Sequence, residues 1–169
     1  RPTRSPAQPA ATRVRLRDFS RSLPMALLRA REAVMRHFRA ALREHDLTEQ
    51  QWRVLRALSS VGEIEIADLA RSTFLLGPSL SRILRDLEAR ALIRRRTDAS
   101  DQRRSLIAIA PGGMTLMEIV APQSEAIYAD ITARFGADRL AQLQDMLRDL
   151  EREMADLAPG SAAEEGGSP

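Results

Sequence analysis

The segment Gly77-Pro-Ser-Leu-Ser-Arg-Ile-Leu-Arg-Asp-Leu-Glu-Ala-Arg90 decides the fold, together with the residues on either side of it. Its apolar side chains recur at three- and four-residue steps, the spacing of a buried helical stripe: Leu80, Ile83, Leu84 and Leu87. Pro78 fits the first turn of this helix, where a missing N–H costs nothing. A shorter helix with Ile66, Leu69 and Ala70 at helical spacing comes before it. The two segments predict a helix-turn-helix.

Two short β-strands follow the second helix. They are Leu92–Arg96 and Ser105–Ile109, and the loop between them, Thr97–Arg104, is entirely polar. A short extended piece at residues 63–65 is expected to add a third, minor strand. A helix-turn-helix with a β-hairpin wing is suited to a DNA major groove and to the neighbouring backbone or minor groove.

Helices are also predicted on both sides of this unit. The first runs from Asp18 to about His45, with Ser20 or Ser22 as its cap and Pro24 in its first turn. The second begins at Thr48, where a Thr followed three residues later by Gln51 has the pattern of a capping box, and it continues through Leu58.

Beyond the wing, Pro111-Gly-Gly113 is expected to be a break before a helix from Met114 to about Phe135, which Pro122 should kink or locally disturb. The last helix is predicted over Arg139–Leu157, with Asp138 as its N-cap. Its apolar residues alternate three- and four-residue steps: Leu140, Leu143, Leu147, Leu150, Met154 and Leu157. This narrow seam is typical of helix pairing between subunits. The fold class is therefore mainly α with a small β-wing, a winged helix-turn-helix with long dimerisation helices at both ends.

The predicted domain covers residues 18–157, with a DNA-binding lobe over about 48–110 and dimerisation helices over about 18–45 and 114–157. Residues 1–17 and 158–169 have no periodic apolar pattern, and we expect both to be disordered tails. The first tail is basic. It is either simply solvated or in contact with DNA or a partner subunit.

Composition limits the possible functions. There is no cysteine, and the two histidines, His37 and His45, lack the partners of a zinc site, so we expect no metal and no cofactor. No paired-carboxylate, triad or Gly-rich phosphate motif supports an enzyme. No run of apolar residues is long enough for a membrane span, and we expect a cytoplasmic protein. Residues 66–110 hold nine arginines against five acidic residues, whereas 111–169 hold four against eleven, so positive charge concentrates on the predicted DNA-binding unit.

Candidate DNA-binding residues lie on this unit. Hydroxyls and guanidinium groups on the outward face of the recognition helix can contact phosphates and base edges: Ser79, Ser81, Arg82 and Arg85. On the wing we select Arg95, Asp101, Arg103 and Arg104, because an arginine at a wing tip can enter a narrow minor groove and Asp101 can orient Arg103. The alternatives are an ordinary solvated helix face and a polar loop without function.

Several strings together resemble the MarR family of transcriptional regulators. They are Leu47-Thr-Glu-Gln-Gln-Trp-Arg-Val-Leu55, Leu80-Ser-Arg-Ile-Leu-Arg-Asp-Leu-Glu88, Leu92-Ile-Arg and Asp98-Ala-Ser-Asp-Gln-Arg-Arg104. Ser22–Glu32 followed by Phe38-Arg is similar to the branch that regulates homoprotocatechuate degradation operons. The resemblance implies a homodimer that binds double-stranded, pseudo-palindromic operator DNA and is released by a small aromatic carboxylate.

The effector site is predicted from one helix face and one aromatic residue. Ser22, Met25 and Arg29 share a face of the first helix, and together they offer a hydroxyl, an apolar surface and a cation for a carboxylate. Trp52 is either a core residue or a wall of the pocket, and Arg53 is a second candidate cation. Arg29 could instead pair with Glu32 or contact a second subunit.

These observations predict a dimeric repressor of an aromatic-acid catabolic operon with no enzymatic activity. The alternative within the same fold is an architectural or stress- and virulence-type DNA-binding regulator that has no effector. A winged-helix protein adaptor is a third class, which the arginine-rich wing disfavours.

Overall fold

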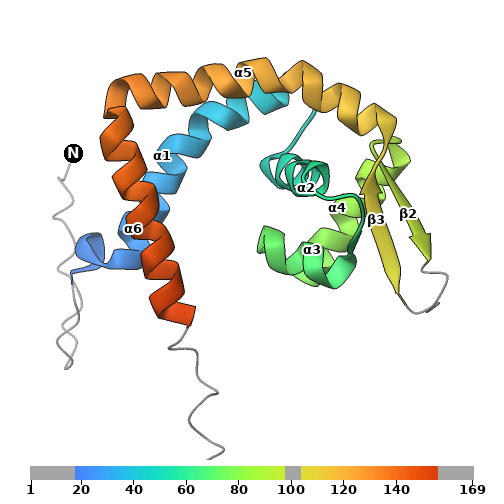
Figure 1. Cartoon of the computed structure of the whole chain (residues 1–169), viewed down its shortest axis with the longest axis horizontal. Coiled ribbons are helices and arrows are strands. Elements are labelled where there is room, and N and C mark those ends of the chain that lie inside the picture. The colour runs from blue at the N-terminus through green and yellow to red at the C-terminus, as the bar shows by residue number, and fades with distance from the viewer. Residues whose placement is uncertain (1–17, 98–103, 156–169) are drawn as a thin grey trace, which may run out of the picture.

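The computed structural model describes residues 18–97 and 104–155 of the chain. From the N-terminal to the C-terminal side, its elements are η1 (Phe19–Arg21), α1 (Leu23–Arg43), α2 (Glu49–Ser59), β1 (Ile64–Glu65), α3 (Ile66–Thr73), α4 (Gly77–Ala89), β2 (Ile93–Thr97), β3 (Ser105–Ile109), α5 (Pro111–Phe135) and α6 (Ala137–Ala155). In Figure 1 a lobe of α2, α3, α4 and the strands lies at one end of α5, and α6 turns back from the other end of α5. The predicted fold class is confirmed.

The lobe is built around the helix-turn-helix pair. Its core includes Leu55, Leu58, Leu69, Leu84 and Leu87, all at 0% exposure. The sheet has the order β1-β3-β2, with both pairings antiparallel, so the predicted third strand is present at the edge. The wing therefore extends directly from the core that holds the recognition helix.

The capping box predicted at the start of α2 is present. The Thr48 hydroxyl accepts a hydrogen bond from the backbone N–H of Gln51 at 3.1 Å. In return, Thr48 N–H donates to Gln51 Oε1 at 2.8 Å. Two N–H groups that the helix geometry leaves without partners are thus satisfied by side chains.

The segment Pro111–Gly113 differs from the prediction, because it forms the first turn of α5 and is not a break before it. Pro111 stands at a position where a helix tolerates proline. Gly113 packs tightly against the backbone of Leu92, the residue before β2, since a Cβ at position 113 would lie 2.1 Å from the Leu92 carbonyl oxygen. The glycine is required by this tertiary contact, which local sequence patterns do not show.

Two helix starts also shift, and Pro122 does not interrupt its helix. Residues Phe19–Arg21 form a separate 3-10 turn, after which α1 begins with Ser22 as its N-cap residue. The helix α5 continues through Pro122 as one 25-residue element. Because α6 begins at Ala137, Asp138 lies within its first turn, where its charge still favours the helix dipole.

The helix α6 buries no side chain within the single chain. Along its apolar seam Leu143 and Leu147 are each 40% exposed and Met154 is 49% exposed, while Leu157 lies outside the described residues. None of the helices in the described part of the chain is both long and apolar enough to cross a membrane.

Candidate DNA-binding face and candidate effector pocket

The recognition helix α4 has two distinct faces, as predicted. Its apolar stripe packs into the lobe, with Leu80, Leu84 and Leu87 at 0% exposure. The four polar candidates on the opposite face are all exposed: Ser79, Ser81, Arg82 and Arg85. The placement of these side chains is compatible with contact to a DNA groove, because no other part of the described chain covers them.

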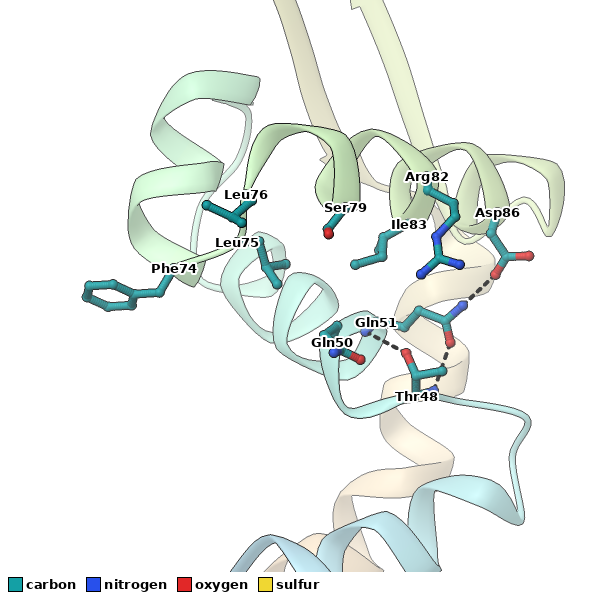
Figure 2. Close-up of a pocket in the computed structure, with 10 residues that line it drawn as sticks. All are labelled: Thr48, Gln50, Gln51, Phe74, Leu75, Leu76, Ser79, Arg82, Ile83 and Asp86. Carbon is teal, nitrogen blue, oxygen red and sulfur yellow. Dashed lines mark hydrogen bonds between the residues drawn. The ribbon is translucent and has the colours of Figure 1, made fainter. Parts of the chain in front are cut away.

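A groove of about 480 Å³ lies between α4 and the start of α2. Figure 2 shows the side chain of Arg82 directed into this groove from α4, with Ser79 one turn earlier on the same helix. The other lining residues come from the start of α2, from the turn before α4 and from α4 itself: Thr48, Gln50, Gln51, Phe74, Leu75, Leu76, Ile83 and Asp86. The groove thus combines hydrogen-bond donors with an apolar edge.

A side-chain hydrogen bond fixes the distance across this groove. Gln51 is 9% exposed, and its Nε2 donates to Asp86 Oδ2 at 2.5 Å. The same amide accepts from the Thr48 N–H, so both ends of the Gln51 side chain are occupied. The capping box of α2 is therefore connected to the recognition helix by a side-chain hydrogen bond.

The wing arginines are partly engaged by acidic side chains. Arg95 lies 3.7 Å from Glu88, and Arg104 forms an ion pair with Glu65 on β1. Asp101 and Arg103, the candidates at the tip, lie outside the described residues. Within the described residues, the pairing of β2 with β3 runs from Ile93 opposite Ile109 to Thr97 opposite Ser105.

A second cavity, of about 550 Å³, lies where the lobe meets the long helices. Aromatic and apolar walls come from α1, α2 and α5, and Phe38 and Tyr128 contact each other with ring centroids 5.0 Å apart. Trp52, at 9% exposure, is both part of the core and a lining residue, so the two alternatives for it are not exclusive. The lining residues are Arg31, Val34, Met35, Phe38, Glu49, Trp52, Arg53, Arg56, Thr73, Phe74 and Tyr128.

The charged side of this cavity is organised by Glu49, whose side chain is only 11% exposed. Arg53 donates to it at 2.7 Å and Arg39 at 3.0 Å, and Arg31 forms a further ion pair with it. The contacts of Arg31 and Arg39 connect α1 to α2, that is, a long helix to the lobe.

Arg39 also binds Glu32 on its own helix, with two hydrogen bonds of 2.7 and 2.8 Å. This hydrogen bonding lowers the pKa of Glu32 below its ordinary value and raises the pKa of Arg39. Both members of the Glu32–Arg39 pair are therefore charged at neutral pH.

The structure brings only part of the predicted effector set together. Trp52 and Arg53 line the cavity, whereas Ser22, Met25 and Arg29 lie on the first half of α1 and do not line it. Sequence reasoning missed Met35, Phe38, Arg56 and Tyr128 as lining residues. The signal for Arg56 was available, because it lies four residues after Trp52 and so shares its helix face.

A recognition helix with an exposed polar face, a β-hairpin wing and long flanking helices together define a winged helix-turn-helix DNA-binding protein. The sequence model of the MarR family matches residues 45–104. The chain belongs to the MarR family, and it is a DNA-binding transcriptional repressor related to a repressor of an aromatic-acid degradative operon.

Three similar proteins show how far this relationship extends. The homoprotocatechuate degradative operon repressor of Escherichia coli is 39% identical over 128 residues, which are 76% of this chain and 86% of that protein. The HTH-type transcriptional regulator FarR of Neisseria gonorrhoeae is 34% identical, over 78% of this chain and 90% of that protein. The crystal structure of NadR in complex with 4-hydroxyphenylacetate is 32% identical and covers 80% of this chain and 99% of that one, with a TM-score of 0.74. The proteins named as relatives are regulators and not enzymes.

Proposed function

We propose that this protein is a homodimeric repressor that a small aromatic carboxylate releases from its operator. The observation that carries the proposal is the 550 Å³ cavity at the junction of α1, α2 and α5, which combines aromatic walls with arginines. A cavity of this size, mostly apolar with a few charged groups, suits one small aromatic acid. The relation to a homoprotocatechuate operon repressor and to a 4-hydroxyphenylacetate complex supports the same ligand class.

In this proposal the Arg56 guanidinium binds the ligand carboxylate. Arg56 lines the cavity one helical turn after Trp52, and within the described residues it forms no ion pair with an acidic side chain. Arg53, in contrast, is already bound to Glu49. The rings of Trp52 and Tyr128 provide flat surfaces for stacking against the aromatic ring of the ligand.

The DNA side of the proposal uses the exposed face of α4 and the wing. Ser79, Ser81, Arg82 and Arg85 are exposed on α4 and would enter the major groove. Arg95, Arg103 and Arg104, with Asp101 orienting Arg103, would contact the backbone and the minor groove. Two such lobes in a dimer would read the two halves of a pseudo-palindromic operator.

The dimer is supported by apolar surface that a single chain leaves open. The seam of α6 is exposed, and Leu23 and Leu27 on α1 are 54% and 39% exposed. In Figure 1, α6 and the first half of α1 lie at the end of the molecule away from the lobe, so these apolar faces belong to one end of the molecule. Pairing of two chains there would set the distance between the two recognition helices.

Release follows if the ligand binds more tightly to a form of the dimer whose spacing does not fit the operator. A ligand with equal affinity for both forms of the dimer would not change the balance between them. The cavity is well placed for such a preference, because its walls belong both to the lobe and to the long helices.

A displacement assay tests this proposal. The operator is first recovered by in vitro selection with the protein, and binding is then followed by fluorescence anisotropy during titration with hydroxyphenylacetates, benzoates and an aliphatic acid of similar size. We expect release by an aromatic acid and none by the aliphatic acid. Tight operator binding that no member of the panel reverses would indicate a regulator without such an effector.

A further inference from the structure

Two apolar side chains in the turn before the recognition helix are almost fully exposed. Phe74 is 82% exposed and Leu76 is 79% exposed, the highest values among the large hydrophobic residues of the described chain. Their neighbour Leu75 packs against the core instead. Exposed apolar groups of this size next to a functional element mark an interaction surface.

Folding does not explain the aromatic ring at position 74. Phe74 is the C-cap residue of α3 and has φ 52° and ψ 38°, a left-handed conformation in which glycine or asparagine is usual. A side chain with a Cβ is disfavoured there, and the exposed ring recovers little of this cost through burial. An outlier of this kind points to a role outside the folded chain.

Phe74 and Leu76 belong to the groove between α4 and the start of α2. Leu76 is the N-cap residue of α4, and both residues line the groove that also contains Ser79 and Arg82. In Figure 2 the Phe74 ring projects outward from the end of α3, and the Leu76 side chain lies at the start of α4. A DNA duplex that receives the first turn of α4 would therefore meet these two residues as well.

We propose that Phe74 and Leu76 contact the 5-methyl groups of thymines in each half of the operator and so help to determine base preference. This inference rests on the proposed binding of α4 in the major groove. The thymine methyl is the apolar group that base pairs present in that groove, and apolar side chains recognise it. Phosphate contacts would give these two side chains no gain, because neither carries a hydrogen-bond donor.

Replacement of single thymines by deoxyuridine tests the contact, because deoxyuridine lacks only the methyl group. Operator affinity is measured by anisotropy at one fixed salt concentration for wild type, Phe74→Asn and Leu76→Ala. For wild type we expect at least one thymine in each half-site whose replacement weakens binding about fourfold, equivalent to the ~0.8 kcal/mol of one buried methyl-sized group. In the variant that lacks the contacting side chain, the same replacement should have no effect.

Two controls separate this role from others. Val61→Ala changes an exposed apolar residue, 41% exposed, that does not line the groove, and it should keep the full dependence on the thymine methyl. The melting temperature of Phe74→Asn should equal or exceed that of wild type, since asparagine tolerates the left-handed conformation better. A lower melting temperature would show that the ring supports the fold.

The outcomes distinguish the inference from the function on which it rests. If wild type shows no operator preference over random DNA, the proposed function fails. If wild type binds its operator specifically but no thymine replacement matters, or if both variants respond to it as wild type does, the inference is overturned. Phe74 also lines the candidate effector pocket. A Phe74→Asn variant with weakened 4-hydroxyphenylacetate binding and unchanged thymine dependence would assign the ring to that pocket instead.

Discussion

Arg53 donates a hydrogen bond from Nη1 to the backbone carbonyl of Thr73, 3.0 Å away, at the last residue of α3. Through Nη2 the same guanidinium binds Glu49 at 2.7 Å. Arg53 lines the candidate effector cavity, and Thr73 is followed by the turn that leads into the recognition helix. One side chain therefore contacts both the pocket and the segment that positions α4.

This contact predicts different effects for two neighbouring arginines. Arg53→Gln should reduce the factor by which 4-hydroxyphenylacetate weakens operator binding, because the hydrogen bond to the end of α3 is lost. Arg56→Gln should weaken ligand binding itself, whereas saturating ligand should still weaken operator binding by the same factor as in wild type. Binding at one site typically changes the affinity at a coupled site by about 5–150-fold. Operator affinity measured by anisotropy, without ligand and at saturating ligand, therefore shows whether this factor is reduced. Equal coupling in wild type and Arg53→Gln would contradict the assigned role.

The hydrogen bond between Gln51 and Asp86 should contribute to stability. Gln51→Ala removes the acceptor of the Thr48 N–H and the amide donor to Asp86, and such losses typically cost about 1–3 kcal/mol. Gln50→Ala is the matched control, since Gln50 is exposed on the same helix turn. Urea denaturation of both variants measures the difference. A loss for Gln50→Ala as large as that for Gln51→Ala would show that the hydrogen bond is not the cause.

The apolar seam of α6 should hold the dimer together. Leu147→Glu combined with Leu150→Glu places two charges in that seam, and we expect unfolded or aggregated chain instead of a stable monomer, because α6 buries no side chain of its own chain. Asp145→Ala changes the ion-paired surface of the same helix and should leave the dimer intact, since exposed pairs contribute about 0–1 kcal/mol. Light scattering reports both results. A well-folded wild-type monomer at micromolar concentration would contradict the dimer.

Operator binding should depend steeply on salt. If the dimer neutralises roughly 6–10 phosphates, affinity should fall on the order of 10³–10⁵-fold between 50 and 200 mM salt. Arg82→Ala should in addition relax base preference, whereas Arg103→Ala should weaken binding with less change at major-groove positions. Equal losses for Arg82→Ala on operator and on random DNA would place Arg82 on a phosphate.

Local patterns were sufficient for the elements of the fold but not for the contacts between distant segments. The stripe of α4 and the capping box at Thr48 depend on nearby residues, and the structure confirms both. Pro111–Gly113 reads locally as a break, and the close approach of Gly113 to Leu92 explains why a glycine stands in the first turn of α5.

The candidate site shows the same division. Helical spacing groups Ser22, Met25 and Arg29 near the start of the first helix, but spacing alone does not tell which half of a long helix faces the lobe. The cavity lies against the second half, where Met35 and Phe38 line it. Tyr128 reaches the cavity from α5, which is far away in sequence, and no local pattern connects it to Trp52. Such convergence depends on the tertiary packing.

The measurement that tests the account most directly is calorimetry of 4-hydroxyphenylacetate with the wild-type protein, free and saturated with operator DNA. Linkage requires that DNA weakens ligand binding by the same factor by which the ligand weakens DNA binding. We predict one ligand site per subunit and a lower affinity in the presence of operator. Equal ligand affinity with and without operator would contradict release by this effector.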